Sequence, residues 1–267
     1  MNKIGLGTSS VFPLKLEESF HIAKEAGYDG LEIMITNDKQ TRDEAYLDSL
    51  VQKYQLPVLS FHAPVLILTH FVWGTDPEVK LRKTAELAAK MNSDTVVVHP
   101  PFSWQGSYSN NFLNIVDNIS SETGVTIGVE NMFPWKLKGK QVEAYKPSWT
   151  EIVNTTPKIT LDFSHAALSG LNSLQLVQEF GEKLHHIHLC DGFGISNPGV
   201  KDKIFDEHLP PGYGNQPVKE TLQVLAENNW TGHVVAEVNT RKQRTKDAKI
   251  AILKETVDFA RNALNLS

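Results

Sequence analysis

Seven short apolar runs in this chain each end on a residue that can bind a metal ion or transfer a proton. These residues are Glu32, His62, His99, Glu130, Asp162, His188 and Glu237. Carboxylate and imidazole groups are ligands for zinc, manganese and iron, and both can serve as general acids or bases. The pattern therefore predicts metal binding, proton transfer or both at a site that these residues share.

Two further motifs place a carboxylate close to a histidine. They are Asp162-Phe163-Ser164-His165 and Asp206-Glu207-His208. Each spacing is common by chance, so the weight of the evidence comes from position: five of the ten histidines lie at expected strand ends or in the loops directly after them. Because side chains alternate along a strand, His186 should lie one layer below His188 and His185 should face the helices. We also expect Cys190 to point away from the interior.

The elements that position these residues alternate between strands and helices. The expected strands are Lys3–Gly7, Tyr28–Glu32, Val58–His62, Thr95–His99, Thr126–Glu130, Lys158–Asp162, Leu184–His188 and Gly232–Glu237. Helices are expected near Leu16–Ala26, Thr41–Gln55, Pro77–Met91, Ser109–Glu122, Ser148–Asn154, Ser173–Gly181, Val218–Asn228 and Thr245–Ala263. Eight such units predict a single (β/α)8 TIM barrel over residues 1–267, with the active site at the C-terminal ends of the strands.

Side chains beside the strand ends are candidates for substrate binding. The long irregular segments all follow strands: Ala63–Asp76, Pro100–Tyr108, Met132–Pro147 and Gly192–Gln216. Trp104 and Trp135 lie in two of them and are expected to form a pocket wall, although packing of the loops is an equal alternative. Arg241 follows the last strand. Glu32 has no companion motif, so a substrate hydrogen bond, a supporting salt bridge and metal binding all remain open.

Composition narrows the class of protein. A net charge of −5 and a pI of about 6.1 argue against a general nucleic-acid binder, which needs a basic face, without excluding a local contact. No apolar stretch approaches the length of a membrane span, and Met1–Pro13 lacks the features of a signal peptide. With one cysteine, Cys190, no internal disulfide is possible, and we expect a cytoplasmic protein. The sequence gives no indication of oligomeric state.

Several motifs along almost the whole chain follow the order of a known superfamily. They are Ser60-Phe61-His62-Ala63-Pro64, Val97-Val98-His99-Pro100, Val129-Glu130-Asn131, Leu161-Asp162-Phe163-Ser164-His165, His186-Ile187-His188-Leu189-Cys190-Asp191, Asp206-Glu207-His208 with Gly212-Tyr213-Gly214, and Ala236-Glu237-Val238-Asn239. The chain resembles the xylose isomerase-like barrels. That superfamily contains sugar and sugar-phosphate isomerases and epimerases, inosose-type dehydratases and zinc-dependent endonuclease IV enzymes.

In the isomerase and epimerase branch, the resemblance implies a core metal site made of Glu130, Asp162, His188 and Glu237. The two glutamates would act as acid and base in proton transfer next to a carbonyl, through an enediolate that the metal stabilises. His165 would contact a substrate oxygen. The implied cofactor is a divalent metal (zinc, manganese or iron), with one to three ions, and the implied substrate is a small carbohydrate.

In the endonuclease IV branch, three zinc sites share these positions. The resemblance assigns them to His62, His99 and Glu130; to Glu130, Asp162, His188 and Glu237; and to His165, Asp206 and His208. The segments after two of these motifs differ from that branch, since Asn131–Trp135 replaces its Ala-Gly-Gln-Gly run and the apolar Val65–Leu68 and Phe71–Trp73 replace a polar loop. We therefore expect a small-molecule isomerase or epimerase, with a zinc-dependent phosphodiesterase as the alternative and a dehydratase or a binding-only barrel as further options.

Overall fold

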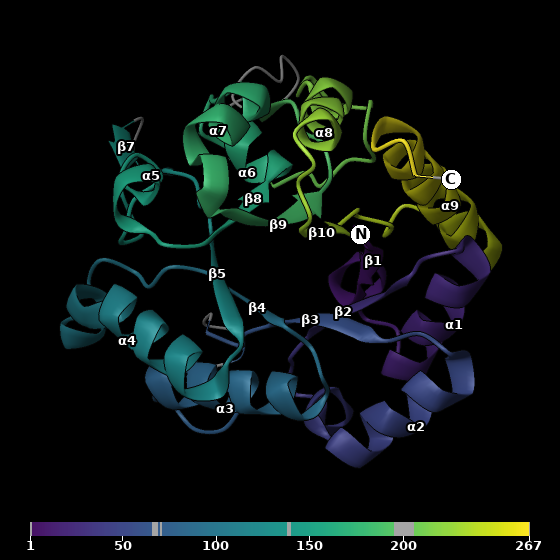
Figure 1. The fold of residues 1–267 in the computed structure, drawn as a ribbon, viewed down its shortest axis with the longest axis horizontal. Coiled ribbons are helices and arrows are strands. Elements are labelled where there is room, and N and C mark those ends of the chain that lie inside the picture. Colours follow the sequence, from purple (N-terminus) through teal and green to yellow (C-terminus); the bar gives the residue numbers. More distant parts are fainter. Residues whose placement is uncertain (1, 66–68, 70, 138–139, 195–205, 267) are drawn as a thin grey trace.

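Eight parallel strands form a closed barrel in the computed structural model of the chain (Figure 1). The model describes residues 2–65, 69, 71–137, 140–194 and 206–266; parts of the expected loops Ala63–Asp76, Met132–Pro147 and Gly192–Gln216 lie outside these ranges. The barrel strands are β1 (Ile4–Gly7), β2 (Gly30–Met34), β3 (Val58–His62), β4 (Thr95–Val98), β5 (Thr126–Glu130), β8 (Ile159–Asp162), β9 (Leu184–Leu189) and β10 (His233–Ala236). The predicted TIM barrel is confirmed.

Helices surround the barrel on its outer face (Figure 1). They are α1 (Leu16–Ala26), α2 (Glu44–Tyr54), α3 (Pro77–Lys90), α4 (Ser107–Thr123), α5 (Ile152–Thr155), α6 (Phe163–Leu168), α7 (Ser173–Phe180), α8 (Val218–Glu227) and α9 (Lys246–Ala263). Local sequence sets several boundaries. Before α3, Asp76 accepts hydrogen bonds from the amides of Glu78 and Val79, and Pro77 occupies the first helical position. Among the described residues, none of these helices is long and apolar enough to cross a membrane.

Three local features differ from the sequence expectation. Strand β2 continues two residues beyond Glu32, so Glu32 lies within the barrel and not at a strand end. The segment Met132–Pro147 contains a short antiparallel hairpin of β6 (Trp135–Leu137) and β7 (Lys140–Val142). The expected helix Ser148–Asn154 is reduced to α5, while the unexpected α6 starts directly after Asp162, whose carboxylate caps it by accepting from the amide of His165.

The interior of the barrel is closely packed beneath the strand ends. The outward faces carry the apolar core, including Ile33, Val98 and Ile187, which have no exposed surface. Inward positions are small where strands approach each other. A Cβ at Gly128 would lie 2.5 Å from Oγ1 of Thr160, so a larger residue there would displace that side chain. Glu130, two residues further along the same face of β5, is completely buried.

At the floor of the barrel, His185 does not have the orientation expected from the sequence. Strand β9 pairs with β8 through Ile159–Leu184 and Thr160–His186, so His185 is an extra residue at a bulge. Its Nε2 lies 3.0 Å from Oγ1 of Thr95, which belongs to β4 across the barrel. The bulge breaks the alternation of side chains, and His185 therefore does not face the helices.

Burial of His185 predicts a measurable loss of stability in acid. Burial, reinforced by the charge of His186, lowers the pKa of His185 to about 4, below the ordinary value of about 6.5. The folded protein therefore favours the neutral ring, and this contribution is complete above pH 6.5 and lost as the pH falls from 6.5 towards 4. We expect His185→Gln to reduce the loss of unfolding free energy between pH 7 and pH 4.5 by about 1–3 kcal/mol.

Urea unfolding at the two pH values measures this effect. The matched control is His21→Gln on α1, outside the barrel, for which the acid-induced loss should equal that of the unmodified protein. An equal loss in the His185→Gln protein would contradict the prediction.

Candidate metal centre

Three carboxylates converge on one histidine at the C-terminal end of the barrel. The Nδ1 atom of His188 lies 3.3 Å from Oε1 of Glu130, 3.6 Å from Oε2 of Glu237 and 3.9 Å from Oδ2 of Asp162. His188, Glu130 and Asp162 have no exposed surface, and Glu237 is 8% exposed. The structure thus brings the four residues of the expected core site together.

The register of neighbouring strands produces this convergence. Strand β9 lies between β8 and β10, and β5 lies on the far side of β8. Asp162 is directly opposite His188 in the β8–β9 pair, and Glu130 is opposite Thr160 in the β5–β8 pair. Glu237 follows the last residue of β10. Glu130 and Glu237 therefore reach His188 from opposite sides along the sheet.

Two histidines flank Glu130 on the side of β3 and β4. The Nε2 atoms of His62 and His99 lie 3.2 Å and 2.8 Å from Oε2 of this carboxylate. Their ring centroids are 4.7 Å apart in an edge-on arrangement. The Nδ1 atom of His99 is buried without a hydrogen-bond partner among the described residues. His62, His99 and Glu130 form one continuous group, as expected from the sequence.

A second flanking group lies beyond Asp162. The Oδ2 atom of Asp206 is 3.2 Å from Nε2 of His165 and 2.9 Å from Nε2 of His208. The Nδ1 atom of His208 lies 2.8 Å from the carbonyl oxygen of Glu237, which orients the ring. His208 has a φ of 43°. Residues other than glycine rarely adopt this backbone conformation, and those that do are often found at functional sites.

The charges in this centre are strongly coupled. Burial acts to raise the pKa of Glu130, but the charges of His99, His188 and His165 outweigh it and hold that pKa well below its usual value. Burial acts to lower the pKa of His208, yet Asp206 and Asp162 raise it to about 10. The carboxylates raise the pKa of His62, His165, His188 and His208 and so favour their protonated forms, whereas burial lowers the pKa of His99. A divalent cation in their place would release these protons.

The residues of the centre fit a divalent metal ion. One donor atom from each of Asp162, His188 and Glu237 lies within 4.8 Å of the others, and the same holds for His62, Glu130 and His188 and for Asp162, His165 and His208. The donors are carboxylate oxygens and imidazole nitrogens, a set that suits zinc, manganese or iron. Burying several carboxylates together is costly unless a cation or proton compensates them. The donor set and its burial together fit such an ion.

Glu32 supports His188 from below. Its Oε1 lies 3.1 Å from Nε2 of His188, while its Oε2 lies 3.0 Å from Nε2 of His186 and accepts a hydrogen bond from Ser60. The carboxylate is 1% exposed. This position favours the supporting salt bridge among the alternatives open for Glu32. It also agrees with the expectation that His186 lies one layer below His188.

Replacing Glu32 should weaken the centre without removing a central donor. A carboxylate behind a ligating imidazole fixes the orientation and basicity of the ring, so we expect Glu32→Gln to lower metal affinity by about 10- to 100-fold. Competition with a chelator measures the affinity. Glu25→Gln, on the exposed face of α1, is the control. An unchanged metal affinity combined with a raised KM would instead assign Glu32 to substrate binding.

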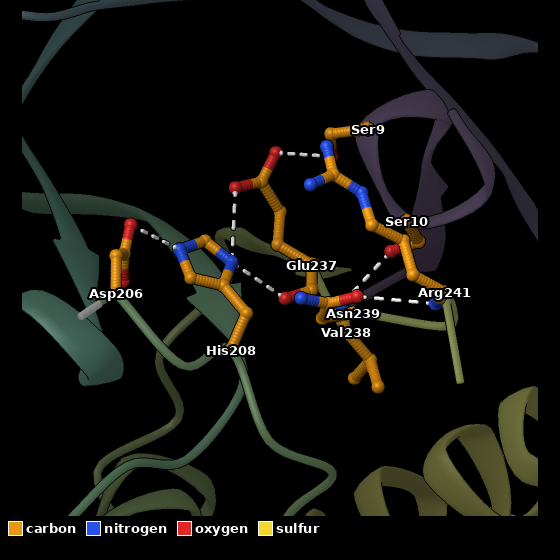
Figure 2. A pocket seen from close by; sticks show the side chains of 8 residues that line it. All are labelled: Ser9, Ser10, Asp206, His208, Glu237, Val238, Asn239 and Arg241. Carbon is orange, nitrogen blue, oxygen red and sulfur yellow. Dashed lines mark hydrogen bonds and ion pairs between the residues drawn. The ribbon is translucent and has the colours of Figure 1, made fainter. Parts of the chain in front are cut away.

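A cavity of about 310 Å³ opens beside this centre (Figure 2). Its lining includes Asp206, His208, Glu237, Arg241 and Ser9. Ser9 donates a hydrogen bond of 2.7 Å to Oε1 of Glu237, a contact that no sequence motif indicates. The cavity gives solutes access to one carboxylate of the centre.

The predicted wall residues Trp104 and Trp135 belong to an aromatic cluster near the centre. Trp104 stacks on Phe102 with ring centroids 4.7 Å apart, and Trp135 meets both rings at an angle. Trp104 is 60% exposed, so one face of its ring is free for contact. Phe133, which packs against this cluster, lies 5.0 Å from the ring of His165. Aromatic side chains thus extend from the centre to the surface.

Several residues of the centre were not found by sequence reasoning. Asn131 pairs with the backbone of Asp162 through both its amide nitrogen and oxygen, and Ser164 donates a 2.6 Å hydrogen bond to Asp206. Cys190 was expected to point away, but its Sγ lies 3.6 Å from Oδ2 of Asp162. Cys190 lies two residues after His188, so strand alternation places both on the same face, and the expectation for Cys190 was wrong.

Asp191 organises the loop that carries Asp206 and His208. Its carboxylate accepts hydrogen bonds from the backbone amides of four residues: Gly192, Gly212, Gly214 and Gln216. A Cβ at Gly214 would lie 2.3 Å from Oδ1 of Asp191, which explains the glycine. The backbones of Asp191 and Leu209 also pair as an isolated bridge. The adjacent His208 is thereby fixed by backbone contacts.

Comparison with known proteins identifies the family. The model of the xylose isomerase-like TIM barrel family matches residues 20–263, and the chain belongs to this family. The chain is similar to Rv0498, an uncharacterized protein of Mycobacterium tuberculosis, with 37% identity over 98% of each chain. It is also similar to the fructoselysine 3-epimerase of Escherichia coli O157:H7, with 20% identity over 89% of this chain and 90% of that relative.

Solved structures support the same fold. The IolI protein with a bound zinc atom has a TM-score of 0.70 and 22% identity, and the match covers 98% of this chain and 99% of IolI. A D-tagatose 3-epimerase-like protein has a TM-score of 0.68 and 24% identity, covering 97% and 98% of the two chains. The family and these neighbours include sugar epimerases.

Proposed function

We propose that the protein is a divalent-metal-dependent isomerase or epimerase that acts on a sugar or sugar phosphate. The observation that carries this proposal is the approach of Glu130 and Glu237 to His188 from opposite sides. Two carboxylates that face a common point can remove a proton from a carbon next to a carbonyl and return one from the other side. Return of the proton to the opposite face inverts the configuration of that carbon, which is the outcome of epimerisation.

Each residue of the centre has a distinct part in this proposal. A divalent ion held by Glu130, Asp162, His188 and Glu237 would supply a Lewis acid that polarises the substrate carbonyl. Ser9 fixes one oxygen of Glu237, leaving the other directed at His188 and His208. His165, which is 4% exposed, is placed to donate a proton to a substrate oxygen. Burial of the whole group excludes water from the reacting carbon.

The surroundings suit a small substrate. A cavity of about 310 Å³ lies at the lower end of the range typical of small-molecule sites. Trp104 and Trp135, in the loops after β4 and β5, add aromatic surface against which the C–H faces of a sugar can pack. Proteins with the same fold are described as a D-psicose 3-epimerase and an L-ribulose 3-epimerase, which supports carbohydrate chemistry as the starting hypothesis.

Exchange of substrate hydrogen with solvent tests the proposal directly. The purified protein, loaded in turn with Zn²⁺, Mn²⁺ or Fe²⁺, is incubated in D2O with a panel of free and phosphorylated ketoses and aldoses. We expect deuterium to enter one carbon next to the carbonyl of at least one sugar, as seen by NMR, together with a new isomer or epimer. Absence of exchange across the panel with all three metals would overturn the proposal.

A phosphodiesterase of the endonuclease IV type is the second candidate. The observation that favours it is the presence of His62 and His99 beside Glu130 and of Asp206 between His165 and His208. These groups match the ligand types of three zinc sites, although proton transfer requires only the core. If His99→Ala and His208→Ala each eliminated cleavage of DNA containing an abasic site, this function would replace the first.

A further inference from the structure

We propose that Arg241 binds an anionic group, a phosphate or a carboxylate, at the end of the substrate remote from the reacting carbonyl. This inference rests on the proposed function and assigns its substrate to acidic sugars. The cavity beside the centre is lined by the acidic and imidazole side chains of Asp206, His208 and Glu237 and by the cationic side chain of Arg241. A ligand that contacts both kinds of side chain must carry different groups for each.

The guanidinium of Arg241 has no partner among the described residues, in contrast to those of Arg42, Arg82 and Arg261. Arg42 bonds the carbonyl oxygen of Thr36, Arg82 pairs with Glu122, and Arg261 pairs with Asp29. Arg241 makes one hydrogen bond through its backbone amide, to Oδ1 of Asn239. Within the described part of the chain, its side chain has no hydrogen-bond or ion-pair partner. Figure 2 shows this side chain extending towards Glu237 and Ser9.

The turn that carries Arg241 is held firmly in place. Ser10 donates a hydrogen bond to the carbonyl of Ala236 and accepts one from the amide of Val238. Thr240, which is 1% exposed, donates a 2.6 Å hydrogen bond to the carbonyl of Ser10. The amide of Asn239 donates to the carbonyl of His208, which ties the same turn to the centre. The backbone of Arg241 is thus fixed relative to Glu237.

The chemistry of this arrangement selects for an anion. A guanidinium offers five N–H donors in a planar fork that matches the oxygens of a phosphate or carboxylate. Glu237 is not an ion-pair partner of this guanidinium, because its carboxylate contacts Ser9 and His208. Arg241 is exposed, so water solvates its guanidinium in the free protein, and an anionic group of the substrate can replace that water with charge-assisted hydrogen bonds. An acidic sugar would place its anion at Arg241 and its carbonyl at the carboxylates and His188.

Binding of small anions tests the inference without depending on catalysis. Inorganic phosphate and acetate are titrated into the unmodified protein and into Arg241→Gln, Arg241→Lys and Arg244→Gln, with isothermal calorimetry as the readout. We expect Arg241→Gln to weaken binding of the preferred anion by about tenfold or more, since tenfold corresponds to ~1.4 kcal/mol. Arg241→Lys should restore part of the affinity because it keeps the charge but loses the fork. Arg244, exposed on the same turn but outside the cavity lining, is the matched control and should bind as before.

The two anions distinguish the source of the charge, and kinetics distinguish this inference from the proposed function. Preference for phosphate indicates a sugar phosphate, and preference for acetate indicates a sugar acid. With D-fructose and D-fructose 6-phosphate as probes of solvent exchange, Arg241→Gln should raise KM for the phosphorylated sugar alone if phosphate is the anion. Equal anion binding by the unmodified and Arg241→Gln proteins would overturn the inference even if exchange occurs. Absence of exchange in every sugar would overturn the proposed function and leave the anion result to stand.

Discussion

Glu130→Gln and Glu237→Gln should each abolish uptake of solvent deuterium into the substrate. Each change keeps the size of the side chain but removes the carboxylate that takes or returns the proton. Removal of a general acid or base typically lowers the rate by about 10²- to 10⁴-fold, and loss of a metal donor adds to this. We therefore expect a decrease in kcat of at least about 10³-fold, measured by NMR of the substrate in D2O.

The two glutamates should differ in their effect on the metal. Glu130 contacts His62, His99, His165 and His188, whereas Glu237 also lines the open cavity. Glu130→Gln should thus disturb metal content more than Glu237→Gln. Glu86→Gln, on the exposed face of α3, is the control and should retain full activity. If either variant of the centre kept exchange within tenfold of the unmodified rate, acid–base roles for that glutamate would be excluded.

Removal of the metal should abolish activity and lower the melting temperature. A ligand that binds the folded state at 1,000 times its Kd stabilises it by about 4 kcal/mol. For a chain of this length, that corresponds to a fall of roughly 10 °C in Tm on chelation. Asp162→Asn should show the low Tm with or without added metal, because it removes a donor that contacts His165, His188 and His208.

Elemental analysis and thermal unfolding with and without chelator measure this effect. Asp117→Asn, exposed on α4, should behave like the unmodified protein in both assays. Protein that carries no tightly bound divalent ion after metal loading, with the same Tm in chelator, would contradict a metal-dependent function. That result would favour a barrel that only binds its ligand.

Much of the barrel and its centre could be predicted because parallel strands impose a simple geometry. When Glu130, Asp162 and His188 each lie at the C-terminal end of a strand in the same barrel, closure of the barrel brings their side chains to the same end of it. That prediction needs only hydrophobic patterning and the positions of the last residues. It did not require knowledge of any contact between distant segments.

The errors have separate physical causes. A bulge turns His185 across the barrel floor, whereas Cys190 shares the face of His188, two residues before it, and so meets Asp162. Glu32 was expected at a strand end, yet β2 continues through Ile33 to Met34. Ser9 was missed for a different reason: it meets Glu237 across 228 positions of sequence, and a lone serine carries no signal.

The backbone amides gathered around Asp191 have a consequence for ion selectivity. They hold the loop next to His208 in position through peptide groups, whose arrangement does not depend on whether an ion is present. A site whose donor atoms are held rigidly before the ion binds cannot contract or expand freely to fit ions of different size. Discrimination among Zn²⁺, Mn²⁺ and Fe²⁺ would then follow ionic radius and preferred coordination number more than intrinsic affinity.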